Sequence, residues 1–294
     1  MSKNLLNETF TKHLGLMKQH FKLLNEDVAT LDNLRYEKNR NGITINGCDP
    51  KPTGDLIIPE KIEGLSVTSI GSHAFSGVSG LTSVSLPRSI KSIGEYAFNK
   101  CTGLTSVKIP DSLTSIGDYA FSECSGLTSV NLPSSIKSIG WRAFFQCSGL
   151  TSMDIPNSLT SLGQEAFEGC SGLTSVNLPS RLTSIGKATF ARCSGLTSVT
   201  IPNSITSIGD WAFLGCSDLT SVNLPSRLTS IGESAFAWCG GLTSVTLPSR
   251  LTSIGERAFL GCDGMTNVTL PRSITSIGEK AFSSTTEILW RRNE

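Results

Sequence analysis

The chain has 294 residues and a nearly balanced charge, with 25 Lys and Arg against 24 Asp and Glu. A formal net charge of +1 gives no overall field that would steer nucleic acid or an anionic membrane to the protein, so neither partner is expected. Charged residues interrupt the first thirty positions, which predicts no membrane span and no Sec signal peptide. We therefore expect a cytoplasmic protein, or one exported by a non-Sec route.

Residues 1–40 are predicted to form an amphipathic helical segment. Its apolar residues recur at steps of three and four, at Leu6, Phe10, Leu14, Met17, Phe21, Leu24, Val28 and Leu31. This spacing predicts a helix with a single apolar seam. The first interpretation is that the seam packs on the repeats and seals their open end. The alternatives are a homodimer that forms through residues 4–34 in the manner of a coiled coil, and a signal for export.

Residues 41–80 predict a first coil that caps the repeats. Ile58-Pro59 and Ile70-Gly71 match positions of the repeat that follows. However, Pro59 precedes Pro87 by 28 residues, five more than one repeat. Such an atypical terminal unit is expected in a repeat protein, because the outermost unit has a neighbour on one side only.

Residues 81–282 repeat with a period of 23 residues. Proline recurs at Pro87, Pro110, Pro133, Pro156, Pro179, Pro202, Pro225, Pro248 and Pro271. Phenylalanine recurs at Phe75, Phe98, Phe121, Phe144, Phe167, Phe190, Phe213, Phe236, Phe259 and Phe282. Two residue types in one register exclude chance. A fixed period of this length predicts a solenoid, whose coils are stable only when they are stacked.

One unit, residues 127–149, shows how the pattern shapes a coil. Polar residues flank Val130 on both sides, which predicts a half-buried strand that Pro133 ends. The two isoleucines that follow predict a second short strand, closed by a glycine. Phe144, with the Ala before it and the Cys three residues after it, has the spacing of one helical turn that faces inward.

Residues 283–294 are predicted to be a C-terminal cap and tail. Phe282 is followed by Ile288, Leu289 and Trp290, which we expect to cover the last coil before a charged terminus. The repeats would then be closed at both ends, as their exposed faces require.

The repeat pattern LxxVxLPxxIxxIGxxAFxxC resembles the BspA-like, or Treponema-type, leucine-rich repeats that occur in many bacterial proteins. The resemblance covers about residues 56–287. It implies a curved, right-handed leucine-rich-repeat solenoid with short parallel strands on its concave face, here preceded by the helical segment. It also implies a protein that binds or adheres and does not catalyse.

No catalytic residues are predicted. The only histidines are His13, His20 and His73, and none has a carboxylate or cysteine beside it at a metal-ligand spacing. The sequence contains no G-x-S-x-G elbow, no G-x-G-x-x-G and no P-loop. We therefore expect no enzyme activity, no metal and no cofactor.

Eight of the nine cysteines occupy one repeat position, which Val78 holds in the first coil. They are Cys101, Cys124, Cys147, Cys170, Cys193, Cys216, Cys239 and Cys262. Equivalent residues of stacked coils point in parallel, so their Cβ vectors do not converge as a disulfide requires. We predict a column of buried free thiols, which favours a reducing compartment.

The residues around each Ala-Phe pair differ most between units. We call the two positions before this pair and the two after it the ridge. The ridge holds five of the seven Tyr and Trp residues, and large aromatic side chains dominate binding hot spots. The predicted ligand-binding residues are Tyr96, Tyr119, Trp141, Phe145, Trp211 and Trp238. The rival site is the concave strand face, where residues such as Asn177 and Thr200 point outward.

The sequence thus predicts a non-enzymatic leucine-rich-repeat scaffold that mediates protein–protein interaction, either of an adhesion type or directed at a host. One alternative is a carbohydrate-binding solenoid that places ridge aromatics against sugar faces. Another is an intracellular scaffold that dimerises through its N-terminal helix.

Overall fold

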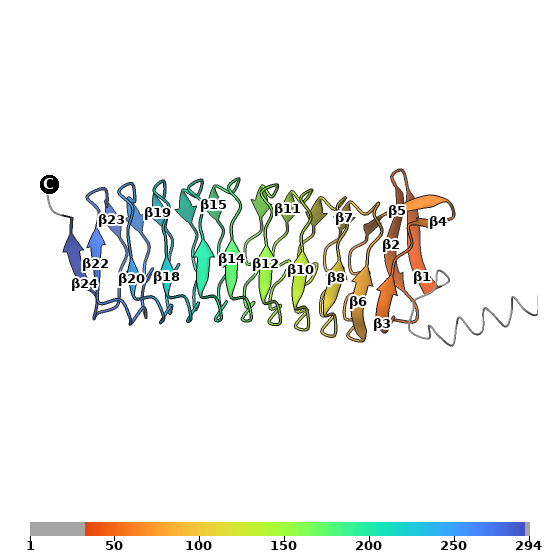
Figure 1. The fold of residues 1–294 in the computed structure, drawn as a ribbon, viewed down its shortest axis with the longest axis horizontal. Helices are drawn as coiled ribbons and strands as arrows, with labels where there is room; N and C mark the ends of the chain where they lie inside the picture. Colours follow the sequence, from red (N-terminus) through yellow and green to blue (C-terminus); the bar gives the residue numbers. More distant parts are fainter. Residues whose placement is uncertain (1–32, 292–294) are drawn as a thin grey trace, which may run out of the picture.

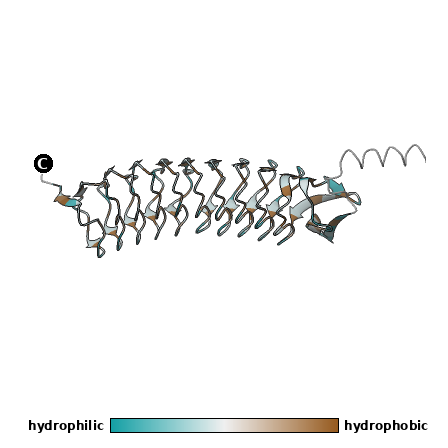
Figure 2. Ribbon diagram, turned by 90° about the horizontal axis from the view of Figure 1, so that it is seen from below, coloured by the Kyte–Doolittle hydropathy of each residue, from teal (hydrophilic) through white to brown (hydrophobic). Residues whose placement is uncertain are grey.

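The structure is a computed structural model that describes residues 33–291. In this part of the chain, short coils follow one another in a single file along the long axis, as Figures 1 and 2 show. Each repeat coil adds one strand to each of two rows, and its third side carries turns. The structure confirms the predicted solenoid with parallel strands. The apolar seam predicted between Leu6 and Leu31 lies outside the described residues.

The first row of strands comes from the Ser-Val-Asn part of each repeat. Its strands are parallel and in register, so that Val130 pairs with Val107 on one side and with Met153 on the other. Val130 is buried while its two neighbours are exposed, as the alternation predicts. The row contains β3 (Gly54–Ile57), β6 (Leu81–Ser85), β8 (Ser106–Lys108), β10 (Ser129–Asn131), β12 (Ser152–Asp154), β14 (Ser175–Asn177), β16 (Ser198–Thr200), β18 (Ser221–Val222), β20 (Ser244–Val245), β22 (Asn267–Leu270) and β24 (Glu287–Trp290).

The second row comes from the Ser-Ile pair that precedes the repeat glycine. These strands are also parallel, and Ile139 pairs with Ile116 and Leu162. The row contains β5 (Leu65–Ile70), β7 (Ser92–Ile93), β9 (Ser115–Ile116), β11 (Ser138–Ile139), β13 (Ser161–Leu162), β15 (Ser184–Ile185), β17 (Ser207–Ile208), β19 (Ser230–Ile231), β21 (Ser253–Ile254) and β23 (Ser276–Ile277). A Cβ on Gly140, which follows β11, would come within 2.6 Å of Asp118 N, so the close approach of coils requires glycine here.

The third side of each coil, which we call the turn side, is not the predicted helical turn. The amides of Arg142, Phe144 and Gln146 donate to carbonyl groups of the next coil, whereas those of Phe145 and Cys147 close tight turns within their own coil. Left-handed φ angles of 51° at Arg142 and 53° at Gln146 exclude a helix. The prediction failed because the apolar spacing specifies which side chains point inward, and these turns bury the same set.

The interior contains columns of identical residues. The phenylalanine rings from Phe75 to Phe282 stack in successive coils with centroids 5.2–5.5 Å apart. Beside them, each of the eight aligned cysteines donates its thiol to a phenylalanine carbonyl of the preceding coil, such as Cys147 Sγ to Phe121 O at 3.1 Å. All nine cysteines are free and buried, which confirms the predicted column of thiols.

Hydroxyl groups on the outside also join each coil to the one before it. Thr128 Oγ1 donates to Thr105 O at 3.3 Å at the start of the first row. Thr206 Oγ1 donates to Thr183 O at 3.1 Å just before the second row. The frequent serines and threonines of the repeat therefore satisfy backbone carbonyl groups that the strand ladders leave partly open.

The N-terminal cap is a hairpin followed by the long first coil. β1 (Leu34–Asn39) pairs antiparallel with β2 (Gly42–Cys48), and β2 extends the second row beside β5. The expectation of a helical segment up to residue 40 is therefore wrong for residues 34–39, because β2 offers a strand edge on which Leu34 becomes buried. The five additional residues of the first coil form a hairpin between β4 (Lys61–Ile62) and β5.

The C-terminal end differs from the predicted cap. β24 pairs with β22 in parallel, but Glu287 aligns with Asn267, so the last step is shorter than one repeat. Ile288, Leu289 and Trp290 are 46%, 41% and 58% exposed, so the prediction that they cover the last coil is wrong. The backbone of β24 continues the first row, while no further coil within residues 33–291 packs on its side chains.

Candidate functional site

The ridge lies along the turn side. The residue immediately before each Ala-Phe pair has a left-handed backbone, with φ of 54° at Tyr96 and Tyr119, 51° at Arg142 and 56° at Glu165. This conformation is uncommon for bulky residues. Successive coils are about 4.8 Å apart. Side chains at this position therefore form an outer column in which neighbours are in contact.

Aromatic rings stack in the N-terminal part of this outer column. The ring centroids of His73 and Tyr96 are 4.8 Å apart, and those of Tyr96 and Tyr119 are 4.5 Å apart, with nearly parallel planes. Trp141, one position earlier in the next coil, meets Tyr119 edge-on at 4.9 Å. Sequence positions one repeat apart have thus become one continuous aromatic surface.

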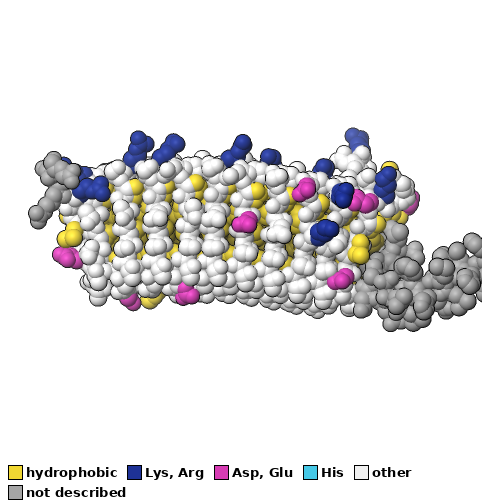
Figure 3. Space-filling model, in the orientation of Figure 1, with side chains coloured by type: hydrophobic (Ala, Val, Ile, Leu, Met, Phe, Trp, Pro, Cys, Tyr) yellow, Lys and Arg dark blue, Asp and Glu magenta, His cyan; other side chains and the backbone are white. Residues whose placement is uncertain are grey.

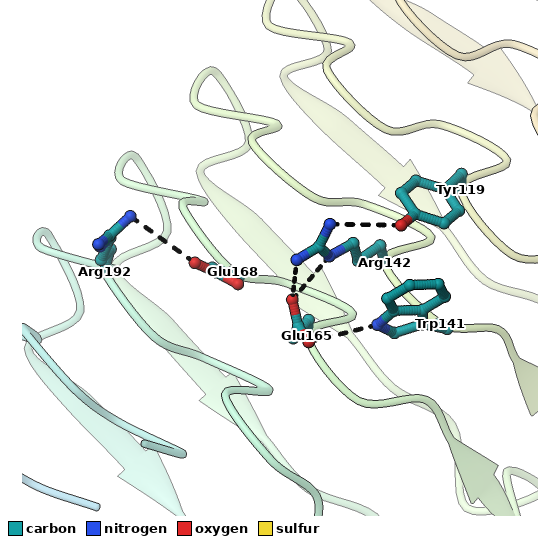
Figure 4. A network of polar contacts seen from close by, with 6 residues as sticks. All are labelled: Tyr119, Trp141, Arg142, Glu165, Glu168 and Arg192. Carbon is teal, nitrogen blue, oxygen red and sulfur yellow. Dashed lines mark hydrogen bonds and ion pairs between the residues drawn. The ribbon is translucent and has the colours of Figure 1, made fainter. Parts of the chain in front are cut away.

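Arg142 ends this stack and is the centre of a polar network (Figure 4). Its guanidinium carbon lies 5.8 Å from the ring centre of Tyr119, 5.0 Å from that of Trp141 and 4.9 Å from that of Phe145. Its Nε donates to Glu165 Oε2 at 2.6 Å, and its Nη1 donates to the Tyr119 hydroxyl at 3.3 Å. Trp141 Nε1 donates to the other Glu165 oxygen at 3.4 Å. Four side chains from three coils therefore hold one another.

Two carboxyl groups beside this network have pKa values that are shifted in opposite directions. Burial tends to raise the pKa of Glu165, but the hydrogen bonds from Arg142 and Trp141 outweigh burial, and its pKa is lowered. Burial and the nearby Glu165 carboxylate raise the pKa of Glu168, which approaches Arg192 at 3.8 Å. Glu165 is therefore the stable anion that fixes Arg142, whereas Glu168 takes up a proton more readily.

The other two predicted residues lie apart from this cluster. Trp211 is half-buried, and Lys187 Nζ lies 4.5 Å from its ring centre. Trp238 is 59% exposed and lies over Gly261 of the next coil, where an added Cβ would come within 2.6 Å of Trp238 Cε3. Each is a single aromatic residue that packs on a neighbouring coil.

The structure therefore brings together Tyr96, Tyr119, Trp141 and Phe145 of the six predicted residues. The sequence interpretation missed Arg142 and Glu165, which organise the group. Tyr96, Tyr119, Arg142 and Glu165 follow one another at intervals of 23 residues. This common repeat position is the sequence signal that identifies Arg142 and Glu165 as neighbours of the tyrosines. The ridge is also less exposed to solvent than expected, because several of its small residues, such as Ala188 and Ser234, are buried.

The strand face is more uniform. Serines before the central residue of each strand are mostly exposed, and the residues after it include Asn177 and Thr200. At its N-terminal end, an open groove of about 970 Å³ runs across three coils. The residues that line it include Ile57, Pro59, Arg88, Lys108, Ile109 and Asp111. This groove mixes both charges and has no aromatic side chain.

Residues 33–291 include no helix with the length and apolar character needed to span a membrane. The same residues contain no group of three His, Cys, Asp or Glu side chains that would hold a metal ion.

Comparison with known proteins identifies the repeats. The BspA type leucine rich repeat region matches residues 60–174 and 183–289, in six copies. The solved leucine-rich repeat protein of T. pallidum is 29% identical over 72% of this chain and 89% of its own, with a TM-score of 0.61. A leucine-rich repeat protein from Bacteroides ovatus shares the fold, with 23% identity over 90% of this chain and 99% of its own and a TM-score of 0.64. None of the curated proteins matches the chain. The chain is a leucine-rich-repeat scaffold and belongs to the BspA type family.

Proposed function

We propose that the chain is a non-enzymatic binding protein that holds a protein partner on its ridge. The site is the cluster of Tyr119, Trp141, Arg142 and Phe145. The observation that carries the proposal is one guanidinium placed against three aromatic rings on an outer surface. Trp, Tyr and Arg are the residue types that dominate hot spots in protein interfaces. Trp141 remains 42% exposed and is available to a partner.

The cluster is ordered before any partner arrives. Glu165 fixes the guanidinium of Arg142, and the Asp118 carboxylate accepts a hydrogen bond from the backbone amide of Trp141 at 2.7 Å. Immobilising a flexible side chain on binding costs about 0.5 to 1.5 kcal/mol. Because these contacts hold the side chains already, a partner that binds here avoids part of that cost.

The arrangement of the rings favours a protein over a sugar. A sugar ring stacks on an open aromatic face, but both faces of Tyr96 are covered, one by His73 and the other by Tyr119. Arg142 lies over Trp141 and Phe145. The cluster therefore offers ring edges, a partly exposed guanidinium and a hydroxyl, which suit the mixed surface of a protein.

The test compares a ridge variant with a strand-face variant. The ridge variant carries Tyr119→Ala, Trp141→Gln and Phe145→Ala, and each new residue occupies the same repeat position in another coil, at Ala188, Gln164 and Ala191. The strand-face variant carries Asn177→Ala and Thr200→Ala. Proteins captured from host and bacterial lysates by the unchanged chain are identified by mass spectrometry, and the affinity of each is measured for all three proteins.

We expect the ridge variant to bind the captured protein at least about a hundredfold more weakly, because three hot-spot side chains are removed. The strand-face variant should bind as the unchanged chain does. Loss of binding in the strand-face variant alone would move the site to the first row of strands. Retained binding in the ridge variant, or glycan binding that the ridge variant loses in place of any protein binding, would overturn the proposal.

A further inference from the structure

The charge of the repeats is separated between two surfaces, although the chain as a whole is nearly neutral. Between the first-row and second-row strands of the repeat coils lie seven cations and a single carboxylate, that of Asp111. We call these cations the basic edge: Arg88, Lys91, Lys137, Arg181, Arg227, Arg250 and Arg272. The ridge of the same coils has the opposite balance, with nine carboxylates against six cations. Figure 3 shows Lys and Arg side chains projecting along the upper edge of the solenoid.

The cations of the basic edge have no partners within residues 33–291. All seven are exposed, and none of their side chains makes an ion pair or hydrogen bond in that part of the chain. On the ridge, by contrast, Lys100, Arg142, Arg192 and Arg257 each lie within 4 Å of a carboxylate. The basic edge is therefore a line of charge that the fold itself does not neutralise.

Three of these arginines occupy a position where four other coils have a serine that bonds to the preceding coil, whereas Ser158 and Ser204 at the same position have no partner among the described residues. Arg181, Arg227 and Arg250 occupy a repeat position that is serine in other coils. Of these serines, Ser112 and Ser135 donate their hydroxyl to a carbonyl of the preceding coil, as do Ser89 and Ser273. The arginines make no such bond among the described residues. Packing within the solenoid gives no reason for their presence.

We propose that the basic edge binds a linear anionic polysaccharide laid along the solenoid axis. Coils are about 4.8 Å apart, so the coils that carry these cations follow one another at steps of about 5 to 10 Å along the solenoid axis. A chain of acidic sugars presents carboxylate or sulfate groups at a similar step. Asn157 and Asn203 lie between the cations, and each uses its Oδ1 to accept a backbone amide of the next coil. Their side-chain N–H groups remain available as donors for sugar hydroxyl groups.

The same features make nucleic acids and membranes poorer occupants. Single-stranded nucleic acid is usually held by aromatic side chains on which its bases stack, and the basic edge has none among its described residues. A membrane surface is contacted by broad basic patches with apolar residues that enter the lipid. The cations of the basic edge all lie within the four residues that follow a repeat proline, and their exposed neighbours are mostly serine, threonine and asparagine. A narrow polyanion is the partner whose shape and charge match this line.

The test removes the three arginines that stand at serine positions. The edge variant carries Arg181→Ser, Arg227→Ser and Arg250→Ser, which restore the residue found in other coils. The control carries Lys100→Gln, Arg192→Gln and Arg257→Ser on the ridge, so both proteins lose three positive charges. Binding is measured by calorimetry at low and physiological salt against a heparin oligosaccharide, an oligogalacturonate and neutral dextran. Phosphatidylglycerol vesicles and single-stranded and duplex DNA serve as competing anions.

We expect the unchanged chain and the control to bind heparin or oligogalacturonate, but not dextran. The edge variant should bind about tenfold more weakly or worse, with a smaller dependence on salt, since fewer charges are neutralised. Equal weakening in both variants would show only a net-charge effect and would overturn the proposal. So would an absence of polysaccharide binding at low salt, or binding to vesicles or DNA alone that depends on the three arginines. Because the ridge is untouched in the edge variant, these results are independent of the proposed protein site.

Discussion

The turn side carries two columns of side chains that share one backbone and one spacing. The inner column repeats a single residue type, and its phenylalanine rings stack from Phe75 to Phe282 at nearly constant distance. The outer column changes along its length: Tyr96 stacks on Tyr119, and the next member, Arg142, pairs with Glu165. The spacing of the coils thus brings neighbouring side chains into contact in both columns. In the inner column these contacts join identical rings, whereas in the outer column they join different chemical groups.

The two columns also differ in their effect on the stability of the fold. The inner column buries apolar rings, which stabilise the stack. The outer column holds bulky residues in a left-handed conformation, such as Trp211 with φ of 57°, and such strain costs of order 1 kcal/mol or more per residue. The inner column therefore maintains the solenoid, whereas the outer column lowers its stability, which is consistent with the binding role proposed for the ridge.

The largest expected effect is on the inner column. Phe190→Ala removes a fully buried ring that stacks at 5.5 Å on both Phe167 and Phe213, and should lower the free energy of unfolding by about 3 to 5 kcal/mol. Urea denaturation followed by circular dichroism should show an earlier and broader transition, because coils on each side lose their common neighbour. The exposed Ser180→Ala serves as control and should be nearly silent. Equal effects of the two changes would mean that the inward-facing set is misassigned.

The outer column should control binding more than stability. Trp141→Gln, which introduces the residue of the next coil, should weaken partner binding by about 2 to 4 kcal/mol. Trp211→Ala and Trp238→Ala remove isolated rings and should each weaken it by less than about 1 kcal/mol. Surface plasmon resonance gives the three affinities, and thermal unfolding should change little. Equal losses at the three tryptophans would mean that the whole ridge binds and that the Arg142 cluster has no special role.

The buried thiols beside the inner column should lower the stability of the protein at high pH. Burial raises the pKa of Cys147 from 9.0 to about 12. Ionisation of this thiol therefore has little effect on stability well below pH 9, and it reduces stability as the pH rises from 9 towards 12, since the unfolded chain ionises first. Near pH 10, Cys147→Val, which introduces the residue that Val78 provides in the first coil, should remove a loss of about 1 to 2 kcal/mol. Urea midpoints of both proteins at pH 7 and pH 10 measure this difference, and parallel pH profiles would contradict it.

The smallest expected effect concerns strain in the outer part of the turn side. Arg192 has a φ of 59° at a ridge position where Gly169 and Gly215 stand in the adjacent coils. Arg192→Gly should therefore raise the free energy of unfolding by about 0.5 to 1 kcal/mol, even though it removes a weak ion pair with Glu168. Differential scanning calorimetry is sensitive enough to detect this change. A lower melting temperature would show that the strain is smaller than the contacts of the arginine.

Much of the fold was predictable because one residue of each kind recurs at a fixed step. Val130, Ile139 and Phe144 point inward as their spacing indicates, and the aligned cysteines are buried. The turn side was not predictable in detail, since a helical turn and a run of tight turns bury the same apolar residues. The N-terminal strand β1 was missed because its apolar residues follow the helical seam so closely that no change of period marks the boundary.

The candidate site was predictable only in part. The aromatic content of the ridge identified Tyr119 and Trp141, but the repeat pattern alone does not say whether a side chain leans toward the coil before it or after it. Arg142 therefore appeared as one charged residue among many, although it joins three rings and Glu165. The basic edge was hidden for a different reason, because the net charge of the chain sums two surfaces of opposite sign.

The bonds between coils also determine how the molecule responds to force. The amide of Phe144 donates to Ala166 O on the turn side, and the hydroxyl of Thr128 donates to Thr105 O beside the first row. These bonds run along the long axis. A force that pulls the two ends apart therefore acts on every interface between coils in series. Within one interface, the bonds on all three sides of the coil resist that force together. The solenoid should therefore act as a stiff rod up to the breaking force of its weakest interface. A tether of this kind transmits tension to a bound partner with little extension.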